Sequence, residues 1–266
     1  MTKHILRPKT LVLGSGTSTG VPLIGCKCPV CKSDDPKDCR MRSSIYITYD
    51  DYSILVDTAP DLRSQALKFD LQRVNSLLIT HNHADHVYGM DDIRQFNRLQ
   101  NSYITAYAAD FTMKALQNMF SYIFDIPESQ KNLYRPHIKF VALDYNPIEL
   151  GPFVVTPFVV PHGPESSLGY RFNCQDSNFV YVPDCSEVTP EMEKMMSGAN
   201  AIMLDGLRAR PHASHITFAA AADTMKKIGS TISYITHIGH DFFHSDIIAM
   251  LPEGVEPAYD GMEFFW

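Results

Sequence analysis

The chain has no apolar run near the roughly 18 to 20 residues needed to cross a bilayer. Residues 1–8 also lack the apolar stretch and the small-residue cleavage site of a secretory signal. No low-complexity tract, long charge run or obvious short repeat interrupts the sequence. We therefore expect a cytoplasmic protein that does not insert into a membrane and that folds as one domain over residues 1–266.

Positive charge is also scarce in this chain. Lysine and arginine number 23 against 30 aspartates and glutamates, which gives a formal net charge of -7. Binding to extended nucleic acid draws most of its free energy from lysines and arginines that displace counterions, so we do not expect such a partner. A small anionic substrate remains possible if metal ions supply the local positive charge.

The six cysteines do not suggest a disulfide framework, because the chain shows no export signal and three of them crowd into Cys26, Cys28 and Cys31. Their spacing favours metal binding over a set of free buried thiols. The fourth ligand is left open by the cysteine pattern, which would also allow a four-cysteine site with Cys39. We expect Cys174 and Cys185 to be structural.

Short strand-like runs alternate with helical patterns along the chain, and polar residues follow several of the strands. Apolar spacing predicts a helix over 110–122 that packs one face on a sheet, and a second helix that begins near His215. The expected core faces of these helices are Phe111, Ala115, Met119 and Tyr122 in the first, and Phe218, Ala222, Met225 and Ile228 in the second. The strands are expected at 10–13, 44–49, 52–57, 76–80, 153–156, 179–182, 201–205 and 232–236.

The most informative segment is His81-Asn82-His83-Ala84-Asp85-His86, which places three imidazoles and one carboxylate within six residues directly after a strand. One histidine alone would be read as a hydrogen-bonded core or surface residue. Imidazole and carboxylate together are the ligands that suit zinc, manganese or iron, and alternate side chains of such a loop can face two adjacent ions. The cluster therefore predicts a metal centre.

The order His-x-His-x-Asp-His after a strand resembles the signature of the metallo-β-lactamase superfamily, whose later motifs follow here at strand ends. This resemblance implies an α/β fold, a four-layered αββα metallo-β-lactamase sandwich. It also implies that Asp57 orients the ligand loop from behind the metal ligands, although an aspartate at a strand end also commonly caps a helix. The implied ligands fall into two sets that share one carboxylate: His81, His83 and His162 on one ion, Asp85, His86 and His237 on the other, and Asp184 between them.

A narrower resemblance, carried by Leu13-Gly14-Ser15-Gly16-Thr17 before the cysteine cluster and Thr236-His237-Ile238-Gly239-His240 near the end, is to the PhnP-type phosphodiesterases. It implies a structural zinc ion held by Cys26, Cys28, Cys31 and His240. It further implies that His215, which lies 22 positions before His237, contacts the substrate phosphate, as in tRNase Z enzymes. The alternative for His215 is a helix cap.

Other polar residues near these motifs are weaker candidates. His212 is a second candidate for the phosphate contact, and His244 is expected to begin the last helix. Arg94, Arg208 and Arg210 could hold phosphate, although solvated surface arginines are more common.

The resemblance implies a phosphodiesterase with two divalent ions, zinc or manganese or possibly iron, whose bridging hydroxide attacks a small cyclic nucleotide or ribosyl phosphodiester. His215 would assist the leaving oxygen and Asp85 would accept a proton from the water. A homodimer is a further implication. The alternatives are a tRNA 3′-processing endonuclease, for which no basic arm is evident, thioester or lactam hydrolysis on the same scaffold, and a non-catalytic carrier resembling PqqB.

Overall fold

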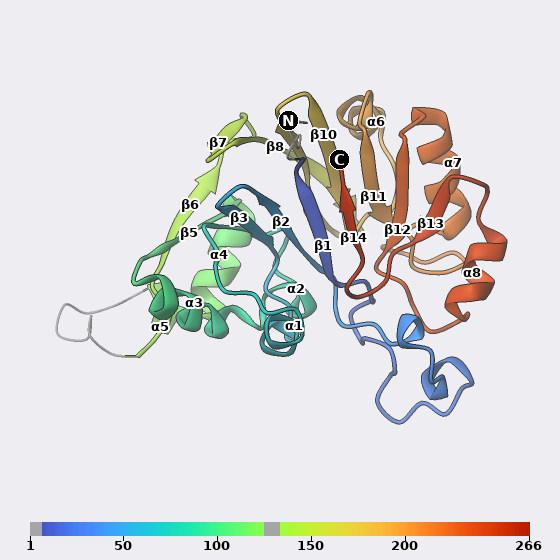
Figure 1. Cartoon of the computed structure of the whole chain (residues 1–266), viewed down its shortest axis with the longest axis horizontal. Coiled ribbons are helices and arrows are strands. Elements are labelled where there is room, and N and C mark those ends of the chain that lie inside the picture. The colour runs from blue at the N-terminus through green and yellow to red at the C-terminus, as the bar shows by residue number, and fades with distance from the viewer. Residues whose placement is uncertain (1–6, 125–133) are drawn as a thin grey trace, which may run out of the picture.

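The computed structural model of the chain describes residues 7–124 and 134–266, which form two sheets packed face to face with helices on both outer faces (Figure 1). The predicted four-layered metallo-β-lactamase sandwich is therefore confirmed. The first sheet has the order β14 (Glu263–Phe265), β1 (Lys9–Gly14), β2 (Ser44–Tyr49), β3 (Tyr52–Val56), β4 (Ser76–Leu78), β5 (Ile104–Ala109) and β6 (Ile138–Leu143). The second has the order β13 (Val255–Pro257), β12 (Ile232–Thr236), β11 (Ala201–Asp205), β10 (Ser177–Val182), β9 (Glu165–Cys174), β8 (Phe153–His162) and β7 (Ile148–Leu150).

The helices divide between the two outer faces. Over the first sheet lie α1 (Leu62–Lys68), α2 (Ala84–Val87), α3 (Ile93–Gln100), α4 (Asp110–Met119) and α5 (Ser121–Phe124), with the short turn η3 (Met90–Asp92) between α2 and α3. Over the second lie α6 (Pro190–Met196), α7 (Phe218–Ile228) and α8 (His244–Met250). The long N-terminal loop contains only η1 (Val30–Lys32) and η2 (Pro36–Asp38). No helix in the described part of the chain is long and apolar enough to cross a membrane.

Strand alternation builds three apolar layers. Side chains that face the other sheet, such as Ile54 and Val56 of β3, belong to the core between the sheets. Leu55, on the opposite face of the same strand, packs under the helices of the first sheet. Val180 and Val182 of β10 do the same under the helices of the second sheet. Successive side chains of a strand point to opposite faces, so strands that are apolar at almost every position are buried on both sides.

The predicted core face of the helix over 110–122 is wrong. Phe111, Met119 and Tyr122 are 37%, 41% and 44% exposed, and α4 instead buries Thr112, Met113 and Leu116. Both stripes contain apolar residues at helical spacing, so periodicity alone did not select between them. Contact with the sheet decided the face, and the helix ends at Met119 before the short α5 continues.

The helix expected near His215 begins three residues later. Its first residue is Phe218, because the hydroxyl of Thr217 accepts a hydrogen bond from the Ala220 N–H at 3.2 Å and caps the helix. The cap reading of His215 is therefore wrong, and His215 lies in the loop that precedes α7. Phe218, Ala222 and Met225 are buried as predicted. His244 is the first residue of α8, also as predicted.

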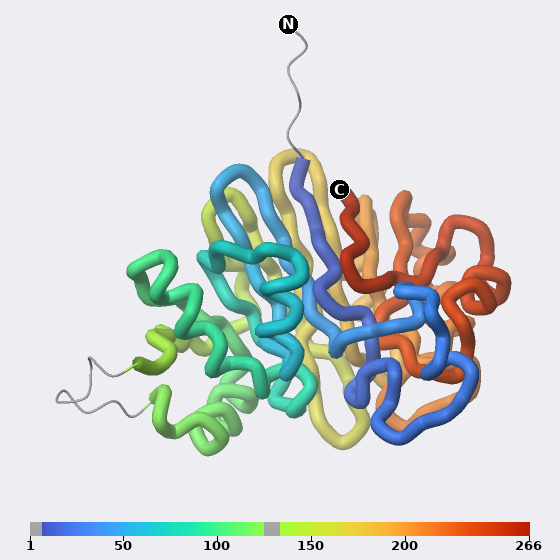
Figure 2. Tube along the Cα trace, turned by 60° about the horizontal axis from the view of Figure 1, so that its bottom comes forward, coloured from blue at the N-terminus to red at the C-terminus, as the bar shows by residue number. Residues whose placement is uncertain are grey.

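A buried polar cluster fastens the N-terminal loop to the C-terminal part of the chain, which lie side by side in Figure 2. The Arg40 side chain is 3% exposed and donates hydrogen bonds to the Ser15 hydroxyl and the Ala258 carbonyl, and its Nη2 contacts His244 Nδ1 at 3.1 Å. Asp260 accepts from the backbone N–H and the hydroxyl of Ser15, both at 2.9 Å. These contacts keep the loop in place beside the end of β12.

We expect this cluster to make stability depend on pH. Burial raises the pKa of Asp260 to about 6, although hydrogen bonds and Arg40 oppose the rise. A carboxyl whose pKa is higher in the folded state stabilises the fold below its unfolded pKa, and that contribution is lost as the pH rises through about 6. Relative to Asp260→Asn, the wild-type chain should therefore lose about 2 kcal/mol of unfolding free energy between about pH 4 and about pH 7.

Urea unfolding of both chains across this pH range measures that difference. The asparagine variant also places an N–H group against the N–H of Met41, which Asp260 accepts at 2.6 Å, but that cost is the same at every pH and cancels from the trend. A constant difference between the two chains would show that Asp260 titrates at its ordinary pKa.

Candidate metal centre

The predicted ligands come from strand ends that meet at one edge of the sandwich. His81 to His86 follow β4, His162 ends β8, Asp184 follows β10 and His237 follows β12. Strands β10, β11 and β12 are parallel, and β8 has the same direction because both β8 and β10 are antiparallel to β9. The carboxyl ends of these strands therefore lie together, which brings residues separated by more than a hundred positions into one site.

The first predicted ligand set is brought together by the structure. Nε2 of His81 lies 2.9 Å from Nδ1 of His83, and Nε2 of His162 lies 3.2 Å from the same atom. The other ring nitrogen of His162 donates to the Ser214 carbonyl at 2.8 Å, which leaves Nε2 with its lone pair toward the other two rings. Three nitrogens on one ion at about 2.0 Å would be roughly 3.3 Å apart, close to these spacings.

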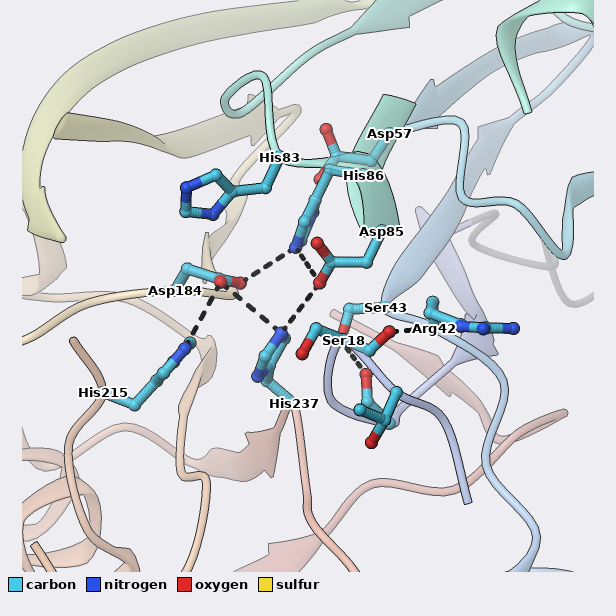
Figure 3. A network of polar contacts seen from close by, with 12 residues as sticks. Ser18, Arg42, Ser43, Asp57, His83, Asp85, His86, Asp184, His215 and His237 are labelled. Atoms are coloured by element: carbon cyan, nitrogen blue, oxygen red, sulfur yellow. Dashed lines mark hydrogen bonds and ion pairs between the residues drawn. The ribbon is translucent and has the colours of Figure 1, made fainter. Parts of the chain in front are cut away.

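The second set lies beside the first. Oδ2 of Asp85 is 3.3 Å from Nε2 of His86 and 3.4 Å from Nε2 of His237. Asp184 lies between the two sets: one carboxylate oxygen is 3.3 Å from His86 Nε2 (Figure 3). The other is 3.6 Å from His162 Nε2. This is the arrangement expected of a carboxylate shared by two ions.

The buried atoms of this cluster fit divalent cations. Nε2 of His86 and Oδ1 of Asp184 are buried and lie 3.3 Å from each other, yet neither makes a hydrogen bond in the described structure. Buried polar atoms without a hydrogen bond cost free energy unless something else binds them. Burial would raise the pKa of Asp184, yet His237 and His86 hold it well below its usual range, so the carboxylate is ionised. Imidazoles and an ionised carboxylate aimed at a common point suit zinc, manganese or iron.

Asp57 lies behind the ligands. It is fully buried and accepts hydrogen bonds from the N–H and the hydroxyl of Thr80, both at 2.8 Å. Nδ1 of His86 donates to the same carboxylate at 2.7 Å, which directs Nε2 of His86 toward Asp85 and Asp184. The residue at the N-cap of α1 is Asp61 and not Asp57. Its placement supports the orienting role that the resemblance implies, and that role remains a prediction.

The cysteine cluster gathers around His240. The sulfurs of Cys26, Cys28 and Cys31 lie 3.6, 3.5 and 3.4 Å from Nδ1 of His240. In a tetrahedral zinc site with Zn–S near 2.3 Å and Zn–N near 2.0 Å, sulfur and nitrogen are about 3.5 Å apart. Cys39 is exposed and lies outside this group. The geometry favours His240 over Cys39 as the fourth ligand of a structural zinc ion.

His215 lies against the centre from the side opposite Asp85 (Figure 3). Its Nε2 is 4.0 Å from an oxygen of Asp184, and its ring stacks on His237 at 4.6 Å between centroids. Nδ1 of His215 donates to Asp205 at 2.9 Å, so Nε2 is the nitrogen that faces the site. Burial lowers the pKa of His215, and the negative charges of Asp184 and Asp85 oppose that effect.

Two residues near the centre were missed by the sequence reasoning. Asp205 is fully buried and also accepts from the N–H of Cys185 at 2.9 Å. The sequence contained a signal for Asp205, because this aspartate ends a predicted strand just as Asp57 follows one, and a polar residue at a strand end can belong to a site. Ser18 carried no signal beyond its glycine-rich loop. Figure 3 draws it near His237, and the N–H of the preceding residue Thr17 donates to the carbonyl of Ile238, the residue after His237.

The structure distinguishes between the remaining candidates for binding the substrate phosphate. His212 stands next to His215, with ring centroids 5.2 Å apart. Arg208 belongs to the same loop, and Arg210 pairs with Asp241 at 3.5 Å. Arg94 lies elsewhere, on α3, where it pairs with Asp91. Arg94 is therefore no longer a candidate for binding the substrate phosphate.

Comparison with known proteins agrees with this geometry. Residues 52–238 match the family described as the beta-lactamase superfamily domain. The chain therefore belongs to the β-lactamase superfamily and has the metallo-β-lactamase fold, which implies divalent metal ions. More particularly, it is similar to a diphosphatase from the PhnP family, with 35% identity and a TM-score of 0.89 over 98% of both chains.

Two curated relatives have other names. The octanoyltransferase of Porphyromonas gingivalis is 33% identical over 261 residues, which are 96% of this chain and 51% of that protein. The chain thus spans about half the length of this relative. The coenzyme PQQ synthesis protein B of Methylobacterium sp. is 24% identical over 232 residues, with 74% of this chain and 72% of that protein covered.

Proposed function

We propose that this chain is a metal-dependent phosphodiesterase that hydrolyses a small substrate such as a cyclic nucleotide or a ribosyl phosphodiester. The observation that carries the proposal is the position of His215, whose Nε2 lies 4.0 Å from the carboxylate that joins the two ligand sets. A proton donor at that place serves a leaving group at the metal centre. The 35% identity to a PhnP-family diphosphatase supports phosphoryl chemistry over lactam chemistry.

The residues of the centre have separable tasks. Two divalent ions bound there would lower the pKa of a water molecule and neutralise charge on the phosphoryl oxygens. His81, His83 and His162 would hold one ion, and Asp184 would be shared with the second. Asp85 accepts a proton at its carboxylate. His215 donates from Nε2 to the departing ester oxygen, while Asp205 keeps its ring in that orientation.

A substrate panel tests this proposal. The protein loaded with zinc or with manganese is offered bis-p-nitrophenyl phosphate, a cyclic ribose phosphate, a precursor tRNA, an octanoyl thioester and a chromogenic cephalosporin. We expect turnover of the small phosphodiesters. Cleavage of the tRNA alone would identify a tRNA 3′-processing endonuclease, and hydrolysis of the thioester alone would assign acyl chemistry. Full metal loading without turnover of any ester would favour a carrier that resembles PqqB.

Replacing His215 with alanine is expected to lower kcat by about 10²- to 10³-fold on a phosphodiester with an alkyl leaving group, because the leaving oxygen then departs without a proton. The loss should be much smaller with bis-p-nitrophenyl phosphate, whose leaving group is stable as an anion. Metal content, measured by elemental analysis, should stay unchanged. His137→Ala is the matched control, since His137 stacks on Tyr103 beside β6. Loss of an ion in the His215 variant would make this residue a ligand instead of an acid.

A further inference from the structure

His237 is a predicted metal ligand whose outer ring nitrogen has no hydrogen bond. The outer nitrogens of His81, His86 and His162 each contact a hydrogen-bonding atom, at 3.0, 2.7 and 2.8 Å. Nδ1 of His237 is buried and has no such partner in the described part of the chain. Its ring is stacked between those of His86 and His215, at 5.8 and 4.6 Å between centroids. Stacked rings can slide past one another, so the position of His237 depends on its backbone.

That backbone is held by the N-terminal loop. His237 lies in the left-handed region with a φ of 58°, which residues other than glycine adopt only where surrounding contacts keep them there. The N–H of Ile238 donates to the Ser15 carbonyl at 2.9 Å, and the Ile238 carbonyl accepts from the Thr17 N–H at 3.1 Å. The residue after His237 is therefore bonded to the loop through both its donor and its acceptor.

The same loop is attached a second time, three residues beyond His237. There Nδ1 of His240 lies 3.4 to 3.6 Å from the three sulfurs of the cysteine cluster. Between Gly14 and Val30, all within the described residues, the loop forms no helix or strand, so its position depends on such attachments. A zinc ion at the cluster would join the loop to the segment that follows β12, and Figure 2 shows these two parts of the chain side by side.

Within the described residues, no hydrogen bond joins the loop of residues 15–31 to the first ligand set, which consists of His81, His83 and His162. The outer nitrogens of that set contact Thr80, which follows β4, and Ser214, which lies in the loop before α7. A shift of the N-terminal loop would therefore reach the second ligand set through His237 and leave the first set in place.

We propose that zinc bound by the cysteine cluster and His240 positions His237, so that the occupancy of this zinc site sets the affinity of the second ligand set for its ion. A ligand that is already held in its binding position loses less conformational freedom when the ion binds. Linkage requires the reverse effect as well: an ion in the second set should raise the zinc affinity of the cysteine cluster by the same factor. The coupling concerns metal affinity and is independent of the substrate.

Manganese binding to the full chain tests this coupling. Mn²⁺ suits oxygen and nitrogen ligands and competes poorly for thiolates, so it reports on the two ligand sets and not on the cysteine cluster. The protein is prepared with one zinc ion per chain, checked by elemental analysis, and free Mn²⁺ is counted by EPR to obtain two dissociation constants. His237→Ala weakens the second set directly, and the constant that this variant retains belongs to the first set.

Cys28→Ser should raise the dissociation constant of the second set by about 10- to 100-fold and change that of the first set less than about twofold. The reason is that the variant loses zinc and with it one of the two attachments on either side of His237. His240→Cys offers four thiolates, which also suit a tetrahedral zinc site. Its second-set constant should follow its zinc content, near the wild-type value if zinc is retained and near that of Cys28→Ser if it is lost.

Gly16→Ala displaces the loop without changing a predicted zinc ligand. A methyl group at residue 16 would lie 2.8 Å from Cβ of Arg40 and 2.9 Å from its carbonyl oxygen, so the loop must shift where it pairs with Ile238. This variant should weaken the second set while zinc is retained. It decides the proposal by itself if the Cys28→Ser chain does not fold.

Leu116→Ala is the control for a general loss of stability, since Leu116 is fully buried under the helices of the first sheet. It should leave both constants unchanged. An equal change of both constants in Cys28→Ser, no change of either, or the same selective change in Leu116→Ala would overturn the coupling. A wild-type chain that binds fewer than two Mn²⁺ ions would overturn it as well. A chain that binds both ions but turns over no phosphodiester would contradict only the proposed function.

Discussion

Asp184→Asn is expected to reduce turnover of a phosphodiester by about 10³- to 10⁴-fold, because the loss of the predicted shared ligand would remove several kcal/mol of charge stabilisation. The carboxylate oxygens of Asp184 face His86, His162 and His237 at 3.3 to 3.6 Å, so a neutral amide would weaken both ligand sets at once. Elemental analysis should show fewer than two catalytic ions per chain.

The matched control for this variant is Asp176→Asn, in the exposed turn that precedes β10, at the opposite end of the strand from Asp184. It changes the same chemical group without touching the centre, and it should retain both ions and full activity. If Asp184→Asn kept two ions and wild-type turnover, Asp184 would not be the shared ligand.

Cys28→Ser is expected to remove one zinc ion per chain and to lower the free energy of unfolding by about 4 kcal/mol when free zinc is about 1,000 times its Kd. For a chain of this size the melting temperature should fall by roughly 10 °C. The physical reason is the position of the site, which joins the N-terminal loop to His240, three residues beyond the predicted ligand His237. Differential scanning calorimetry and elemental analysis measure both effects.

Cys39→Ser provides the comparison for that experiment. Cys39 is exposed and stands outside the group of Cys26, Cys28, Cys31 and His240, so its replacement should cost neither zinc nor stability. If zinc were lost from the Cys39 variant and retained in the Cys28 variant, the predicted ligands of the structural zinc ion would be wrong.

One part of the candidate metal centre could be predicted from the sequence because its predicted ligands are neighbours in the chain. His81, His83 and His86 stand within six residues after a strand, and that density has few explanations other than a metal. The strand β4 was likewise expected near its observed position, because a short apolar run bounded by polar residues marks a buried strand.

Other features depended on packing that periodicity does not contain. The helical pattern predicted that α4 buries the face with Phe111 and Met119, whereas the structure buries the face with Met113 and Leu116. Both faces carry apolar residues at helical spacing, so the pattern alone could not select between them. Asp205 was passed over because its partner His215 lies ten residues away across a loop, and only the fold closes that gap to 2.9 Å. His212 was a weaker candidate for the phosphate contact in the sequence, and only the fold shows that its ring lies 5.2 Å from that of His215.

The sequence by itself determined the ligand types, the order in which they occur and the superfamily that this order resembles, because those properties are written in short segments. The resemblance also implied which imidazoles share a carboxylate and which cysteines meet His240, but only the tertiary structure supplied the distances between them and the loop that borders the centre. Strands β4, β8, β10 and β12 end at one edge of the sandwich because of how the sheets pair and pack. That pairing involves residues far apart in the chain, and no local pattern encodes the distances between them.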